Sequence, residues 1–128
     1  MLGHLKQRVA EVLASAQVAN LATCGPTGLQ SRFYPCAALG MQLYLLVPAT
    51  SDQLFNLEHV PTAVASTTEW QLYGRGYVLP VEQGPPGLVW PEFVDTAGCV
   101  LVHLRPVRLQ INQPRGWGYR ETIDIEGE

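Results

Sequence analysis

The order of the extended segments in the middle of this chain constrains its fold more than any other feature. Short apolar or alternating runs bounded by glycine- and proline-containing turns are typical of strands, and such runs lie at residues 18–24, 29–37, 41–47, 62–68 and 70–80. Because only short links join the first three, we expect an antiparallel meander. The last run alternates strictly. Its Gly74 and Gly76 share one face, which indicates a bend or the close approach of another backbone or a ligand.

Two helices are expected beside these strands. Apolar residues recur at helical spacing within residues 2–16, which predicts an amphipathic helix over one side or end of a core, with an apolar stripe of Leu5, Val9, Val12, Leu13 and Ala16. Thr50 and Gln53 have the spacing of a capping box, so a short helix should begin there. It should end at Val60, because the residue before Pro61 avoids helical geometry.

The C-terminal third completes the predicted architecture. Residues 83–98 are rich in Pro and Gly, and we interpret them as a packed excursion because Trp90 and Phe93 need burial. A long final strand is expected over residues 99–111, where Pro106 indicates an edge position or a bulge. Six or seven strands with one or two helices predict a mainly β, small antiparallel barrel, folded as one domain over residues 1–128.

Composition excludes several classes of protein. With 47% hydrophobic and 15% charged residues, the chain should fold into a globular domain. A net charge of −3 with scattered basic residues argues against a nucleic-acid surface. No apolar run reaches the roughly 18 residues that span a bilayer, and Lys6, Arg8 and Glu11 interrupt any signal-peptide pattern. We therefore expect a cytoplasmic protein with no membrane contact.

No metal site or hydrolytic centre is predicted. The cysteines lack CxxC spacing and lie in apolar, strand-like contexts, which favours buried thiols in a reducing compartment, at Cys24, Cys36 and Cys99. The histidines are isolated from one another and from the cysteines, at His4, His59 and His103. No nucleophile–base pair or carboxylate pair can be argued from spacing. This pattern is compatible with a protein whose cofactor supplies the chemistry, and equally with a non-enzyme.

Taken in order, the segments VANLATCG, GLQSRFYPCAA, MQLYLLV, TSDQLFNLEHVP, TAVAST and WQLYGRGYV resemble the FMN-binding split barrel of the pyridoxamine 5'-phosphate oxidase superfamily. The resemblance covers roughly residues 5–80 well and the remainder weakly. It implies a six- or seven-stranded antiparallel split barrel with an N-terminal helix and a short helix after the third strand. It also implies FMN as the cofactor and a homodimer with two flavin sites across its interface.

The resemblance also implies which residues would meet FMN. Arg32 matches a basic residue that contacts the phosphate, and Gln71 matches a glutamine that reaches the flavin. The ring would lie along Phe33, Tyr34 and Pro35, and the phosphate would be left with Arg32, the helix amides and the cap residues Thr50, Ser51 and Gln53. From the residues alone, Arg32 and Gln71 can equally be exposed strand positions. The cap residues can equally serve the helix without any ligand.

The helix start departs from the family pattern. The family's helix opens with Ser followed by Arg and Lys, whereas this chain has Ser51, Asp52 and Gln53. A phosphate there would lose two cations and meet one carboxylate, and each lost charge-assisted bond costs about 1.5–3 kcal/mol, or about one to two decades of affinity. The sequence therefore leaves open whether FMN is bound tightly, weakly or not at all.

Two functions remain open from the sequence. The leading hypothesis is a dimeric FMN-binding flavoprotein, an oxidoreductase of unknown substrate. The alternative is a binding or interaction module on the same fold that has lost FMN, or that holds haem or a deazaflavin without catalysis. An oligonucleotide-binding barrel is disfavoured by the acidic balance. Classical pyridoxamine phosphate oxidation is disfavoured because the C-terminal part has no basic cluster to hold a substrate phosphate.

Overall fold

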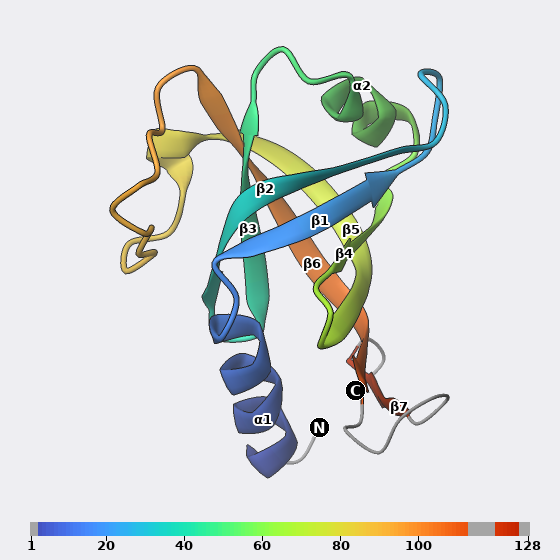
Figure 1. Cartoon of the computed structure of the whole chain (residues 1–128), viewed down its shortest axis with the longest axis vertical. Coiled ribbons are helices and arrows are strands. Elements are labelled where there is room, and N and C mark those ends of the chain that lie inside the picture. The colour runs from blue at the N-terminus through green and yellow to red at the C-terminus, as the bar shows by residue number, and fades with distance from the viewer. Residues whose placement is uncertain (1–2, 113–119, 126–128) are drawn as a thin grey trace.

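A computed structural model of the chain describes residues 3–112 and 120–125 (Figure 1). The described elements follow the predicted order: α1 (Gly3–Ala14), β1 (Val18–Thr23), β2 (Gln30–Leu39), β3 (Gln42–Pro48), α2 (Asp52–His59), β4 (Thr62–Ser66), β5 (Trp70–Pro80), the short 3₁₀ turn η1 (Val81–Gln83), β6 (Cys99–Asn112) and β7 (Arg120–Asp124). Strand β7 was not predicted as a separate strand. The aromatic residues Trp117 and Tyr119 lie outside the described residues.

The strands form one antiparallel sheet that closes on itself. Their order is β3-β2-β1-β4-β5-β6-β7, and β3 also pairs with β6, which turns the first six strands into a barrel. Strand β7 adds to the far half of β6 outside that closure. The predicted mainly β barrel with two helices is therefore confirmed.

The barrel wall is split between β2 and β3. These strands pair only where residues 36–39 meet residues 42–45. Beyond that point the first half of β2, residues 30–35, pairs with β1, whereas residues 46–48 of β3 pair with β6. Helix α2 follows β3 and lies over this end of the barrel (Figure 1). The divergence leaves an opening in the wall beside the start of α2.

The core lies inside the barrel and under α1. Alternate strand residues point inward and are fully buried, and Val9 and Leu13 of α1 join the same cluster, which includes Leu21, Leu43, Leu45, Trp70, Leu72, Leu104 and Leu109. Burying one such large side chain stabilises the fold by about 1.5–3 kcal/mol. The predicted apolar stripe of the N-terminal helix therefore has the expected role of covering the barrel.

The excursion after η1 packs against the outside of the barrel. Tyr44, Leu46 and Leu101 form a second buried cluster on the outer faces of β3 and β6, and the excursion covers it with Leu88, Trp90 and Val94. The prediction of a packed excursion holds for Trp90. It is wrong for Phe93, which is 67% exposed because its ring lies beyond the edge of this cluster.

The two glycines of β5 mark close approaches, as predicted. A Cβ on Gly74 would lie 2.3 Å from the backbone oxygen of Arg105, and one on Gly76 would lie 2.9 Å from a methyl group of Leu57. The register between β5 and β6 shifts at Tyr73 and Gly74, opposite Pro106. Pro106 therefore lies at a bulge, where its lack of an N–H costs the strand pairing no hydrogen bond.

Candidate functional site

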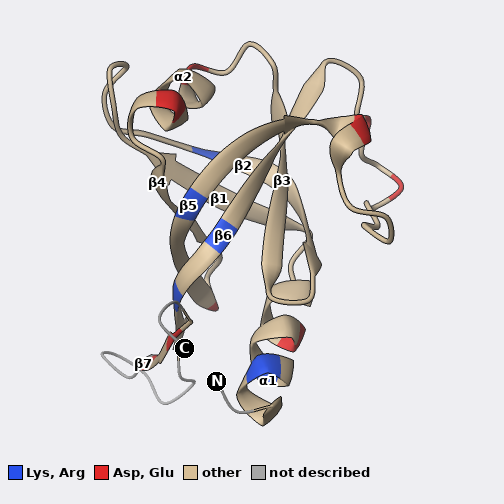
Figure 2. Cartoon of the chain, turned by 180° about the vertical axis from the view of Figure 1, so that it is seen from behind, with Lys and Arg blue, Asp and Glu red and all other residues tan. Residues whose placement is uncertain are grey.

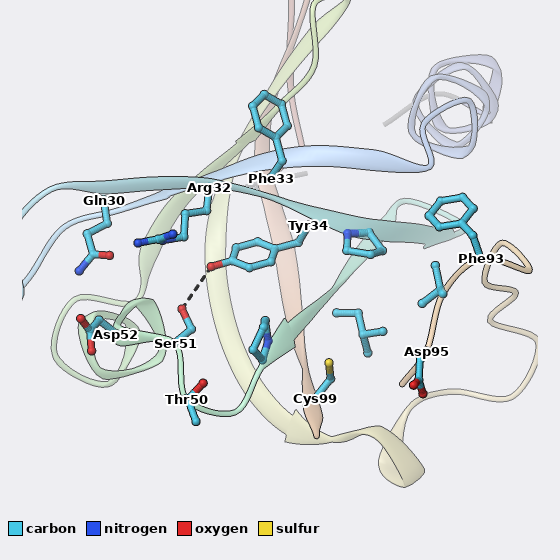
Figure 3. Close-up of a pocket in the computed structure, with 14 residues that line it drawn as sticks. Gln30, Arg32, Phe33, Tyr34, Thr50, Ser51, Asp52, Phe93, Asp95 and Cys99 are labelled. Carbon is cyan, nitrogen blue, oxygen red and sulfur yellow. Dashed lines mark hydrogen bonds between the residues drawn. The ribbon is translucent and has the colours of Figure 1, made fainter. Parts of the chain in front are cut away.

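A pocket of about 780 Å³ lies at the opening between β2 and β3. The first half of β2 forms one wall, the end of β3 and the start of α2 form another, and the excursion closes the side near Cys99 (Figure 3). Its lining residues are Gln30, Arg32, Phe33, Tyr34, Pro35, Leu46, Pro48, Thr50, Ser51, Asp52, Phe93, Val94, Asp95 and Cys99. Its size falls within the roughly 300–1,000 Å³ typical of sites for small molecules and cofactors.

Most of the predicted cofactor-binding residues meet in this pocket, namely Arg32, Phe33, Tyr34, Pro35, Thr50 and Ser51. Successive β2 side chains alternate between the two sides of the strand. Arg32 and Tyr34 therefore point toward α2, while the Phe33 ring points the opposite way and is 72% exposed (Figure 3). Tyr34 is buried, and its hydroxyl lies 3.1 Å from Ser51 Oγ at the floor of the pocket.

Gln71 does not line this pocket. It is exposed on the outer face of β5, opposite Gln110, where it borders a small separate hollow with Tyr73 and Arg108. Since β1 and β4 separate β5 from β2 in the sheet, Gln71 and Arg32 belong to different parts of the barrel surface. Its role toward a flavin stays a prediction from the resemblance.

Gln53 lies beneath the pocket and not in it. The N-cap of α2 is Ser51, whose Oγ accepts from the backbone N–H of Gln53 at 3.2 Å. The predicted capping box of Thr50 and Gln53 is therefore wrong, because the helix begins one residue later than the pattern indicated. The Gln53 side chain is fully buried, and it turns into the end of the barrel, where it donates to strand carbonyls.

The hydrogen bonds of Gln53 tie α2 to the first two strands. Its Nε2 donates to the carbonyl oxygen of Leu21 at 2.8 Å, to Thr23 Oγ1 at 3.2 Å and to the carbonyl oxygen of Gln30 at 3.3 Å. Its Oε1 accepts from the Tyr34 hydroxyl at 2.6 Å. Both polar atoms of this side chain are thus hydrogen-bonded to other residues of the barrel.

Asn56 completes the same buried network, and this role was not predicted from the sequence. Its Oδ1 accepts from the backbone N–H and the hydroxyl of Thr27 at 2.9 and 2.7 Å. Its Nδ2 donates to the carbonyl oxygen of Gly28 at 3.0 Å and to Thr23 Oγ1 at 3.2 Å. The spacing of Gln53 and Asn56, three residues apart, puts two amides on one helix face. That spacing was the available signal that α2 turns a polar face inward.

Acidic residues flank the pocket. Asp52 lies at the start of α2 and Asp95 on the excursion, at opposite ends of the site (Figure 3). Arg32 is the one cation among the lining residues, and it makes no ion pair with any residue in the described ranges. Elsewhere, Lys and Arg are spread over α1, β5 and β6 (Figure 2). The formal charge of the lining side chains is therefore −1, from one Arg and two Asp.

The free edge of β2 adds backbone groups to the site. Residues 30–35 pair with β1 on one side, and no described strand pairs with them on the other. An unpaired strand edge presents N–H and C=O groups in a row. These groups face the opening, where they can bind the polar edge of a planar ligand.

The remaining chemistry-bearing side chains have structural surroundings. Burial raises the pKa of Cys36 to about 12, whereas Cys24 is exposed, so the prediction of buried thiols is wrong for Cys24. His103 stacks on Tyr44 and lies 2.7 Å from Gln42 Oε1. Within residues 3–112 and 120–125, no group of three His, Cys, Asp or Glu side chains is arranged to hold a metal. Neither described helix has the length and apolar character needed to cross a bilayer. A cytoplasmic location stays a prediction.

No protein-family model and no curated protein sequence matches this chain. Solved structures match its fold. A protein related to general stress protein 26, of the pyridoxinephosphate oxidase family, from Clostridium acetobutylicum aligns with a TM-score of 0.69 and 11% identity over 98% of this chain and 97% of the other. The chain has the split-barrel fold of pyridoxamine 5'-phosphate oxidase-like proteins.

Other solved structures with this fold carry names that refer to other ligands. A haem-binding protein from Mycobacterium smegmatis aligns with a TM-score of 0.60 and 18% identity over 97% of this chain, which spans 59% of that protein. An F420 reductase aligns with a TM-score of 0.59 and 21% identity over 77% of this chain and 94% of the other. At such identities the likeness establishes the fold.

Proposed function

We propose that this chain is a flavin-binding split-barrel protein that holds the ring of its ligand in the pocket between β2 and β3. The observation that carries the proposal is the coincidence of this pocket with the residues that the family resemblance assigned to FMN. Arg32, Tyr34 and Pro35 come from β2, and Thr50 and Ser51 come from the link between β3 and α2, so two separate segments converge on one cavity.

The ring part of a flavin suits the lining. Tyr34, Pro35, Leu46 and Val94 offer apolar surface, and the free edge of β2 offers backbone donors and acceptors for a heterocycle with a polar rim. When bound, a flavin supplies hydride transfer itself. The protein would then bind and orient the ring and limit the access of water to it. On this basis the activity we propose is that of an oxidoreductase.

A binding module without catalysis is the second candidate. The observation that favours it is the pair of carboxylates at the two ends of the pocket, which opposes a flavin phosphate. Proteins of this fold described as a haem-binding protein and as an F420 reductase support a pocket that tolerates other planar ligands. Haem and a deazaflavin are therefore the ligands to test beside FMN.

A homodimer is part of the proposal. Tyr73 and Tyr77 leave 45–46% of their surface exposed along the outer face of β5, which is a suitable surface for a two-fold contact. Size-exclusion chromatography with light scattering should give twice the 14.1 kDa mass of the chain. A particle of the single-chain mass would remove this part of the proposal.

A ligand titration with two matched variants tests the binding function. Flavin fluorescence should be quenched saturably by the wild-type protein. Thr50→Trp should abolish the quenching, because Thr50 is exposed and lines the pocket. Thr122→Trp is the control, since Thr122 is exposed on β7 outside the lining. If flavin, deazaflavin and haem all fail to bind the wild type, the proposed function is wrong.

A further inference from the structure

We propose that the pocket selects a flavin-type ligand with a hydroxylated, phosphate-free tail, as in riboflavin, over the phosphomonoester FMN. This inference rests on the proposed function, because it concerns the tail of the same ligand. It is carried by the α2 end of the pocket, where the direction of the hydrogen bonds and the balance of charge both disfavour a phosphate.

The orientation of the Gln53 amide is fixed by its surroundings. Its nitrogen faces the carbonyl oxygens of Leu21 and Gln30, which only accept hydrogen bonds. A flipped amide would place its oxygen against both carbonyls. Gln53 Oε1 must therefore face Tyr34, and the single hydroxyl hydrogen of Tyr34 must be donated to it at 2.6 Å.

This fixed bond sets the polarity of the pocket floor. Because the Tyr34 hydrogen is already donated, the 3.1 Å contact between Tyr34 and Ser51 requires the Ser51 hydroxyl as donor. Ser51 Oγ also accepts from the Gln53 N–H. Both hydroxyls thus present lone pairs to a ligand, and Ser51 could donate to a phosphate only by giving up its bond to Tyr34.

Gln30 extends the same polarity along the pocket wall. Its Nε2 donates to Thr27 Oγ1 at 2.7 Å, which leaves the amide oxygen as the group on the pocket side (Figure 3). The α2 end therefore displays acceptors on Gln30, Tyr34, Ser51 and Asp52. A chain of ligand hydroxyls can donate to these atoms, whereas the oxygens of a phosphate dianion can only accept.

Charge acts in the same direction. A phosphomonoester carries about −1.5 to −2 at pH 7, and Asp52 lies in the first turn of α2 where the dipole would otherwise favour that charge. Arg32 can contribute one cation. Gln53, the residue after Asp52, supplies no second cation, because it is uncharged. It is also fully buried, and its polar atoms are already hydrogen-bonded. The Thr50 hydroxyl and the first amides of α2 can still donate to a phosphate, but the single lining cation Arg32 is set against Asp52, so a neutral tail fits this end better than the phosphate of FMN does.

The test is a pair of titrations, one of riboflavin and one of FMN, with the wild-type protein. Flavin fluorescence is the readout of binding in both. We expect riboflavin to bind at least as tightly as FMN. Tighter binding of FMN would overturn the inference while leaving the proposed function standing. If neither flavin binds, both the inference and the flavin proposal fail.

Charge variants on α2 give a second readout. Asp52→Arg should tighten FMN relative to riboflavin by about tenfold or more, the worth of one charge-assisted bond. Asp52→Asn should give a smaller gain in the same direction. Glu58→Arg makes the same change in charge at an exposed position outside the pocket lining. It should leave the ratio of FMN affinity to riboflavin affinity unaltered. Equal ratios in Asp52→Arg and the wild type would overturn the inference.

Discussion

Removing the Gln53 side chain should destabilise the protein far more than its position near a helix start suggests. Gln53→Ala deletes four hydrogen bonds from a fully buried position. Thr23 retains the donor of Asn56, and Tyr34 can turn its hydroxyl to Ser51. The main loss is thus the partner of the Leu21 carbonyl and the short bond to Tyr34.

Leaving a buried polar group unsatisfied costs about 1–3 kcal/mol, and each lost buried methylene adds about 0.8 kcal/mol. We therefore expect Gln53→Ala to lower the free energy of unfolding by about 3 kcal/mol. For a chain of 128 residues, this corresponds to a fall in Tm of roughly 10 °C. Urea unfolding monitored by tryptophan fluorescence measures this loss directly. The slope of the free energy of unfolding against urea concentration should be the same in the variant and the wild type.

The matched control is Gln83→Ala, which truncates an exposed glutamine in η1 and should cost no more than about 0.5 kcal/mol. Gln53→Glu keeps the volume but replaces the donor nitrogen. Burial should raise the pKa of the new carboxyl, so its penalty should grow as pH rises above about 4.3. A Gln53→Ala variant as stable as Gln83→Ala would refute the account of the pocket floor.

Three further outcomes are expected. Gly74→Ala should lower the free energy of unfolding by roughly 1–3 kcal/mol, because the added Cβ would meet the backbone oxygen of Arg105 at 2.3 Å; unaltered stability in urea would contradict this. At pH 8 a thiol reagent should label exposed Cys24 in the native protein, while Cys36, whose pKa burial raises to about 12, should react only on unfolding. Burial, and then the charge of Arg105, lower the pKa of His103. Its contribution to stability should therefore be complete above about pH 6.5 and fall as the pH drops below it, a dependence that His103→Gln should flatten.

The sequence predicts the barrel well because its signals are local and repeated. Short links between alternating runs specify neighbouring antiparallel strands, and Gly74, Gly76 and Pro106 mark the bulge region that the structure contains. The pocket wall from Arg32 to Pro35 could be assigned because one continuous strand supplies it.

The start of α2 could not be predicted from pattern alone. Thr50 and Gln53 fit a capping box in sequence, but the choice of Ser51 as cap depends on strand carbonyls that come from β1 and β2. The roles of Asn56 and Phe93 depend likewise on tertiary packing, which buries the first and leaves the second exposed. Strand β7 forms only because the partner strand β6 is long enough to pair beyond the barrel.

The most direct measurement of the central claim is an NMR map of amide shifts on addition of riboflavin to the labelled protein. The account predicts that the largest shifts lie along residues 30–34 of β2, at residues 46–47 of β3 and at the start of α2. Shifts confined to the outer face of β5 and β6, or no shifts at all, would contradict it.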